Sequence, residues 1–199
     1  MAEPKLIVNP LSGEQIVILR SASQTGGQVL DWELRLAPGG RVPSSHAHPA
    51  QQETFTVLEG TMRFRVGWRR IIARPGQRVL VPPGTVHHFA NAGPVTARVA
   101  VESRPALRME DLLEIAAALA QDQHAAGRAL PRPLDLALFM TEFEREIAAP
   151  YLPRSLVRLV MRAIARAGRR AAAARQASSS ARQVSSPARR APGTARVRN

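Results

Sequence analysis

Three histidines and one glutamate in the first half of the chain have the types and spacing of a metal site. His46 and His48 are two residues apart, so on a strand both imidazoles would point to the same face. Glu53 follows after five more residues, and a turn at 49–50 would bring it back to that face. His87 comes much later, after Pro-Pro-Gly-Thr-Val. We therefore predict one metal ion bound by His46, His48, Glu53 and His87.

The side-chain types of these four residues restrict which metal ion could bind. The chain contains no cysteine, which excludes a thiolate site, a disulfide framework and a cysteine nucleophile. Three imidazoles and a carboxylate suit one divalent Fe, Mn, Ni, Cu or Zn ion and leave coordination positions for water or substrate. The alternative is a vestigial site of plain core residues. It is disfavoured because a buried glutamate beside three histidines would cost several kcal/mol of desolvation, of the order of 2–7, without an ion.

Two motifs carry these residues, and both resemble those of the cupin superfamily. The first is Gly40-(five residues)-His46-Ala47-His48-(four residues)-Glu53-(six residues)-Gly60, and the second is Gly76-(five residues)-Pro82-Pro83-Gly84-(two residues)-His87-(three residues)-Asn91. The resemblance covers roughly residues 25–104, with both motifs of a single-domain cupin type 2 intact. It implies a small jelly-roll β-barrel with a divalent metal inside, bound by the two His, the Glu and the later His.

The hydropathy pattern of the first half agrees with an all-β domain. Residues 30–36 alternate between apolar and polar side chains, as a half-buried strand does. Further strands are predicted at 14–20, 53–58, 61–66, 69–73, 78–82, 86–90 and 95–102, separated by glycine- and proline-containing turns. Many short strands at regular spacing predict an antiparallel sandwich or barrel over 1–104.

The pattern becomes helical after Pro105. Apolar residues recur at helical spacing over 108–127 and 134–149, and a third helix begins near Arg154. After Gly168 the chain is rich in Ala, Ser and Arg and poor in large apolar residues, so we expect a disordered tail. The predicted fold class is thus a cupin barrel at 1–104, a helical extension of about three helices at 105–167 and a disordered basic tail at 168–199.

The net charge of +13 is concentrated at the C-terminal end. Nine arginines and no acidic residue fall in 166–199, which leaves 19 basic and 15 acidic residues in 1–165. The tail has no aromatic residue that could stack on bases, so we do not expect nucleic-acid binding. The N-terminal sequence lacks the order of a secretory signal, and a cytoplasmic location is expected.

Several apolar side chains are candidates for lining a pocket. Phe55, Val57 and Phe89 share the parity of the neighbouring ligands, and Trp32 and Leu34 are further candidates. The equal alternative is that they only fill the interior of a small barrel. His88 has the opposite parity from His87 and is predicted to be a surface or packing residue. Asn91 is predicted to hold a turn, because Gly93-Pro94 follows it.

Function is less determined than fold, since cupins include enzymes, regulators and storage proteins. The first hypothesis is a metal-dependent, dioxygenase-like enzyme similar to quercetin dioxygenases, acting on a small, partly apolar molecule, with Glu53 as ligand and base. The alternatives are a non-catalytic sensor that binds a small molecule and signals through its helices, and a metal-dependent isomerase or decarboxylase. A homodimer is expected. Membrane contact through the amphipathic segment 154–170 is a less favoured option.

Overall fold

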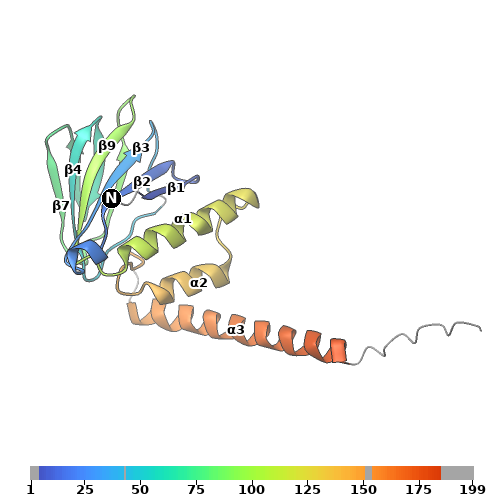
Figure 1. Ribbon diagram of the computed structural model, residues 1–199. Helices are drawn as coiled ribbons and strands as arrows, with labels where there is room; N and C mark the ends of the chain where they lie inside the picture. The colour runs from blue at the N-terminus through green and yellow to red at the C-terminus, as the bar shows by residue number, and fades with distance from the viewer. Residues whose placement is uncertain (1–4, 43, 151–153, 185–199) are drawn as a thin grey trace, which may run out of the picture.

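The computed structural model describes residues 5–42, 44–150 and 154–184. Nine strands are followed by three α-helices, with one short 3-10 turn after the second strand (Figure 1). The strands are β1 (Lys5–Asn9), β2 (Glu14–Arg20), β3 (Leu30–Leu36), β4 (Gln52–Glu59), β5 (Met62–Val66), β6 (Arg69–Ala73), β7 (Arg78–Val81), β8 (His87–Asn91) and β9 (Ala97–Arg104). The helices are α1 (Met109–Ala125), α2 (Pro133–Glu142) and α3 (Arg154–Val184).

The strands form two antiparallel sheets with the core between them. The larger sheet has the order β1-β2-β3-β9-β4-β7, and the smaller has the order β6-β5-β8. Phe55 of the larger sheet meets Phe64 and Phe89 of the smaller, with ring centroids 5.2 and 5.4 Å apart. The predicted all-β fold class is confirmed, and each predicted strand matches an observed one within a few residues.

The period-two pattern explains how each strand is buried. Leu30, Trp32, Leu34 and Leu36 on β3 are all buried in the core, because alternate side chains of a strand point to one face. Their partners on β9 are in register, with Trp32 opposite Val101 and Leu34 opposite Val99. This pairing stabilises the centre of the larger sheet, where β3, β9 and β4 are adjacent.

The helices lie beside the sheets at one end of the molecule (Figure 1). Met109 and Leu112 of α1 are buried in the same core as the strands, and α1 also contacts β1. Phe143, just after α2, is fully buried in that core too. The helical extension is therefore attached to the β-domain through a shared apolar core.

One predicted helix boundary is wrong. The second helix ends at Glu142 and not at 149, because the chain returns to the β-domain: the Ala148 N–H donates to Ala47 O at 2.8 Å, and the Ala47 N–H donates to Ala148 O at 3.2 Å. Apolar residues at 143 and 147 continue the helical spacing by coincidence, since both pack on the core from a non-helical segment.

The third helix continues beyond Gly168, to Val184, and the disorder expected of 168–199 stays a prediction. A Cβ at Gly168 would lie 2.3 Å from Leu134 Cδ1, which shows that this glycine allows α3 to approach α2 closely. The Ala- and Arg-rich sequence that follows has high helix propensity, and the helix extends to Val184. The part of the predicted tail at 185–199 lies outside the described residues. Among the helices that the structure describes, none combines the length and apolar character needed to cross a membrane.

Candidate metal centre

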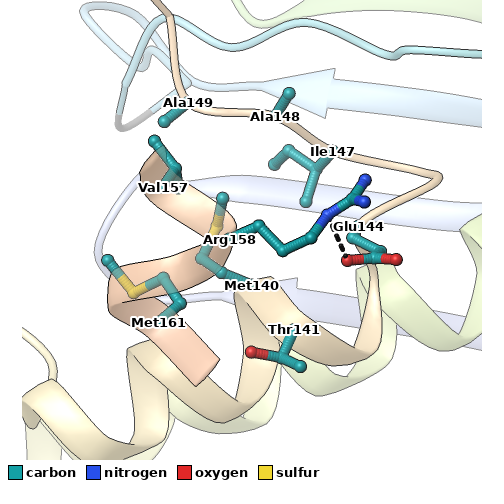
Figure 2. Close-up of a pocket in the computed structure, with 9 residues that line it drawn as sticks. All are labelled: Met140, Thr141, Glu144, Ile147, Ala148, Ala149, Val157, Arg158 and Met161. Atoms are coloured by element: carbon teal, nitrogen blue, oxygen red, sulfur yellow. Dashed lines mark ion pairs between the residues drawn. The ribbon is translucent and has the colours of Figure 1, made fainter. Parts of the chain in front are cut away.

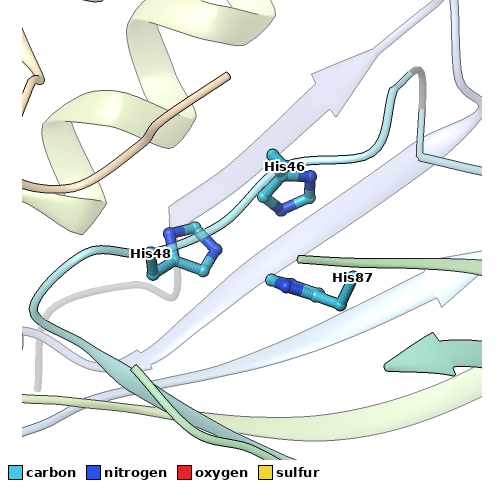
Figure 3. Close-up of side chains that lie close together, drawn as sticks. All are labelled: His46, His48 and His87. Carbon is cyan, nitrogen blue, oxygen red and sulfur yellow. The ribbon is translucent and has the colours of Figure 1, made fainter. Parts of the chain in front are cut away.

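The structure brings the four predicted ligands together from three chain segments. His46 lies in the segment before β4 and pairs with His87 of β8, since each backbone N–H donates to the other residue's carbonyl, at 3.1 and 2.8 Å. His48 follows two residues later, and the chain then bends at 49–50. Glu53 lies on β4 and is buried between β7 and β9. The predicted turn therefore brings Glu53 back to the histidines. Figure 3 shows the rings of His46, His48 and His87 close together.

The possible donor atoms of the four residues lie close together. One ring nitrogen from each of His46, His48 and His87 lies within 4.8 Å of the others. Glu53 Oε2 is 3.1 Å from His87 Nε2 and 3.3 Å from His48 Nε2. Ligand atoms about 2.1 Å from an ion and at right angles to each other would be about 3 Å apart. The three histidines could together hold a divalent metal ion, with Glu53 beside two of them.

Each of the three imidazoles has its Nδ1 directed at a backbone carbonyl. The contacts are His46 Nδ1 to Ser44 O at 3.0 Å, His87 Nδ1 to Thr85 O at 3.1 Å, and His48 Nδ1 to Glu146 O at 2.5 Å. A carbonyl accepts only, so Nδ1 carries the proton in each ring. In a neutral imidazole the Nε2 lone pair is then free. These contacts orient all three rings as metal ligands are oriented in proteins.

This arrangement has an electrostatic consequence at Glu53. The bare Nε2 atoms of His48 and His87 face the oxygen of an ionised carboxylate, so three lone pairs converge on one small region. Such a contact is repulsive unless a cation lies between the groups or the rings take up a second proton. A divalent cation satisfies all of these donors at once.

The protonation states of Glu53 and His46 agree with metal binding. Burial raises the pKa of the Glu53 carboxyl, but the imidazoles of His48 and His87 outweigh it and hold that pKa well below its usual range. Burial and the repulsion of His87 and His48 lower the pKa of His46 to about 3. Burial also lowers the pKa of His48, but the nearby Glu53 carboxylate raises it by more. The pKa of His48 is therefore above its ordinary value. At neutral pH, Glu53 is therefore ionised and His46 is neutral, which are the forms that coordinate metals.

A comparison with known protein families supports the same assignment. The family model described as "Cupin domain" matches residues 32–102, which contain all four of these residues. Residues 32–102 form a cupin domain. The match ends just before the helices begin, so α1, α2 and α3 are additions to the cupin domain of this chain.

Three of the solved structures similar to the chain match about half of its length. A predicted oxalate decarboxylase from Thermotoga maritima shares 20% identity over 51% of this chain and 91% of its own, with a TM-score of 0.47. A sugar phosphate isomerase from a cupin superfamily, from Silicibacter pomeroyi, shares 21% identity over 51% and 71% of the two chains, with a TM-score of 0.45. KdgF from Halomonas sp. shares 14% over 53% and 90%, also with a TM-score of 0.45. No curated protein matches the chain.

The helical extension contacts the metal centre of the cupin domain directly. Glu146, whose carbonyl accepts the hydrogen bond from His48, lies 98 residues away in the chain. Its carboxylate accepts from the Arg108 N–H at 3.3 Å, which ties it to the start of α1. Gln51, between His48 and Glu53, donates from Nε2 to the carbonyls of Pro105 and Ala106, both at 2.9 Å. The sequence carried no signal for these contacts, because they use backbone atoms.

One polar residue of the cupin domain was also missed. Ser103 is fully buried on β9, and its Oγ donates to Glu53 Oε1 at 3.3 Å. Trp32 Nε1 in turn donates to Ser103 Oγ at 3.3 Å. These bonds orient the second oxygen of the glutamate. The available signal was a serine at an inward position of β9, after Val99 and Val101.

The predicted pocket-lining side chains lie in the core of the cupin domain. Trp32, Leu34, Phe55, Val57 and Phe89 are all buried there, and their contact with a ligand stays a prediction. The cavity shown in Figure 2 lies elsewhere, between α2, α3 and the 143–149 segment, where Arg158 and Glu144 form an ion pair at 3.1 Å. His88 faces away from the core, as predicted. Asn91 holds its turn by donating from Nδ2 to Leu36 O and Val95 O, at 2.8 and 2.7 Å.

Proposed function

We propose that this protein is a metal-dependent cupin that acts on a small, partly apolar molecule at one divalent ion held by His46, His48, Glu53 and His87. The observation that carries the proposal is the convergence of the His48 and His87 Nε2 atoms on the buried Glu53 carboxylate, with the His46 ring beside them. A divalent Fe, Mn, Ni, Cu or Zn ion would supply Lewis acidity and an open position for substrate.

The residues around the ion would control substrate approach, the orientation of Glu53 and proton transfer. His46 is the only one of the three histidines that is partly exposed, so a substrate would approach from its side. Ser103 and Trp32 hold one oxygen of Glu53, and the other oxygen faces the histidines. Glu53 would act as ligand and, when it leaves the ion, as the base that accepts a substrate proton.

The reaction that we propose first is oxidation of the substrate by O₂, as in cupins similar to quercetin dioxygenases. The apolar interior behind the histidines, with Phe55 and Phe89 buried there, suits an aromatic or partly apolar substrate. A metal-dependent isomerase or decarboxylase would use the same ligand set without O₂. We also propose a cytoplasmic homodimer, on the sequence features described above.

Anaerobic purification followed by metal analysis and oxygen-uptake assays tests this function. We expect close to one divalent metal per chain, and oxygen consumption with one of a set of flavonoids, thiols and small keto acids after each metal is restored. The control is the His48→Ala, His87→Ala double variant, which should lose both metal and uptake. If the metal is fully bound and turnover needs no O₂, the reaction is isomerisation or decarboxylation and not oxidation. Absence of bound metal would overturn the proposal.

A second function, a metal-containing sensor, is favoured by one specific contact. The hydrogen bond from His48 to the Glu146 carbonyl connects the metal centre to the segment between α2 and α3. A ligand that shifts His48 would therefore act on the helices directly. Ligand binding without turnover, together with changed protection of residues 143–149 from hydrogen exchange, would identify a sensor.

A further inference from the structure

The outer face of the smaller sheet carries a row of basic side chains in register across its three strands. Arg65 on β5 lies opposite Arg70 on β6 and opposite His88 on β8. Arg63, two residues before Arg65, points to the same face. Neighbouring strands are about 4.8 Å apart, so the row spans about 10 Å. We refer to Arg63, Arg65, Arg70 and His88 as the basic row.

The basic row borders a hollow and stands beside an exposed aromatic ring. The same four side chains, with Phe64, line a cavity on this face. Trp68, in the turn between β5 and β6, is 87% exposed, and the Arg65 guanidinium lies 5.9 Å from the centre of its ring. An exposed tryptophan held by an arginine offers an open aromatic face next to the positive charges.

On the larger sheet, by contrast, several outward arginines are paired with carboxylates. On its outer face Arg98 forms ion pairs with Glu33 and Glu59, at 2.8 Å for Glu33, and Arg35 pairs with Glu33 at 2.7 Å. Within the described part of the chain, no carboxylate lies within 4.0 Å of a guanidinium nitrogen of the basic row. Like charges directly opposite each other destabilise a sheet, so the unpaired arginines favour a negatively charged ligand.

We propose that the basic row binds a small phosphate-bearing anion, with pyrophosphate as the simplest member of the class. Arginine binds phosphate oxygens through paired N–H donors, and a row about 10 Å long fits two linked phosphoryl groups. A long polyanion would need basic side chains continuing beyond the row; its neighbours Ile72 and Ala90 are apolar, although Arg41 pairs with Ala90 at the edge of the sheet.

The proposed anion site is separate from the metal centre. His87 and His88 are successive residues of β8, so their side chains point to opposite faces; His87 is fully buried and His88 is partly exposed. His88 Nδ1 lies 3.3 Å from Ser45 Oγ, next to His46 in the chain. Anion binding can therefore be measured on metal-free protein, and its failure would leave the metal proposal intact.

Calorimetric titration of metal-free protein with pyrophosphate at about 0.15 M ionic strength tests the site, with quenching of Trp68 fluorescence as a second readout. We expect saturable binding of one pyrophosphate, weakened at least tenfold by Arg65→Gln and by Arg70→Gln. The matched control, Arg78→Gln, removes an exposed arginine from the larger sheet and should change affinity less than twofold. Trp68→Phe should remove the fluorescence response and leave the calorimetric signal.

Several outcomes would overturn the proposal. One is the absence of pyrophosphate binding to wild-type protein at this ionic strength, and another is an equal loss of affinity in the Arg65, Arg70 and Arg78 variants. Binding to phosphatidylserine vesicles or single-stranded RNA, with none to pyrophosphate, would replace the small anion by a macromolecular partner. Thermal melting must show that the variants fold, and Arg63→Gln serves as a third test variant if one of them does not.

Discussion

The direction of three imidazole rings would control the chemistry of the proposed metal centre. Backbone carbonyls of Ser44, Thr85 and Glu146 accept the Nδ1 protons, so no side chain is needed to select the tautomer. Glu53 then supplies the only negative charge among the four predicted ligands. Its position between His48 and His87 makes it the residue on which the affinity for a divalent cation should depend most.

Replacing Glu53 with glutamine should weaken metal binding by at least about tenfold, since even outer partners of metal ligands contribute about 10–100-fold. The substitution keeps the shape of the side chain and removes its charge. Competition with a chelator measures the affinity, and Glu59→Gln on the same strand is the control. Unchanged metal affinity would exclude Glu53 as a ligand, and full turnover in the metal-loaded variant would exclude it as a base.

A second buried glutamate has a different environment. Glu14 on β2 is buried and accepts a hydrogen bond from Ser12 Oγ at 2.6 Å. Burial raises the pKa of its carboxyl to about 7, against an ordinary value of 4.5. The folded state therefore holds the proton more tightly than the unfolded state. Its contribution to stability is full below pH 4.5 and declines as the pH rises towards 7 and beyond.

Glu14→Gln should remove this dependence. At pH 8 we expect the variant to be more stable than the wild type by about 1–3 kcal/mol, because no charge has to be buried. Below pH 4.5 the two proteins should differ little. Urea unfolding at pH 4.5, 6 and 8 measures the difference, with Glu102→Gln on the surface as a control. A constant difference across this range would show that Glu14 does not titrate on unfolding.

At the scale of elements, the segment after α2 matters most, because it connects the helical extension to the proposed metal centre. It leaves the helix at Glu142, places the Glu146 carbonyl against His48 and pairs Ala148 with Ala47. The extension thereby contributes one of the three carbonyl acceptors that orient the histidines. Metal affinity and attachment of this segment should therefore be coupled, and the coupling must be reciprocal.

Ala148→Pro should weaken metal binding by about 10–100-fold, the range found for lost outer-shell partners. Proline removes the N–H that donates to Ala47 O, and His48 then loses its fixed acceptor. The same substitution in the exposed connection between α1 and α2, Ala129→Pro, is the control. Metal should in turn protect residues 146–148 of the wild type from hydrogen exchange. Equal metal affinity in both variants would contradict the coupling.

At the scale of the whole molecule, α3 leaves apolar side chains on the surface. Val157, Met161 and Gly168 face α2 or the cavity beside it, whereas Leu156, Leu159 and Val160 are 51%, 68% and 43% exposed. Arg158 and Arg162 pair with Glu144 near the end of α2. Part of the basic face is thus neutralised within the chain, which favours a protein partner over an anionic membrane.

A homodimer formed through this face should dissociate when its leucines are replaced. Light scattering should give a dimer for the wild type and a monomer for the Leu156→Ser, Leu159→Ser double variant, with an unchanged β-sheet spectrum. Leu130→Ser, exposed in the connection between α1 and α2, is the control. A monomeric wild type that co-sediments with anionic liposomes would instead support the membrane option for 154–170.

The sequence alone determined the strands, the cupin domain and the identity of the four converging residues. Local information suffices for these features: the period of two fixes which side chains share a face, and the turn at 49–50 and the parity of His87 follow from spacing. His88 and Asn91 were also placed correctly for this reason. The metal, the reaction and the oligomer stay predictions.

Only the tertiary structure showed how the helices relate to the metal centre. The end of α2 at Glu142, the contact of Glu146 with His48 and the close approach of α3 to α2 at Gly168 all depend on partners distant in the chain. Backbone carbonyls and a glycine approached by Leu134 carry no side-chain pattern that a periodicity could reveal. The basic row is similar, because Arg63, Arg65 and Arg70 become one charged surface only when the register of β5 and β6 places them side by side.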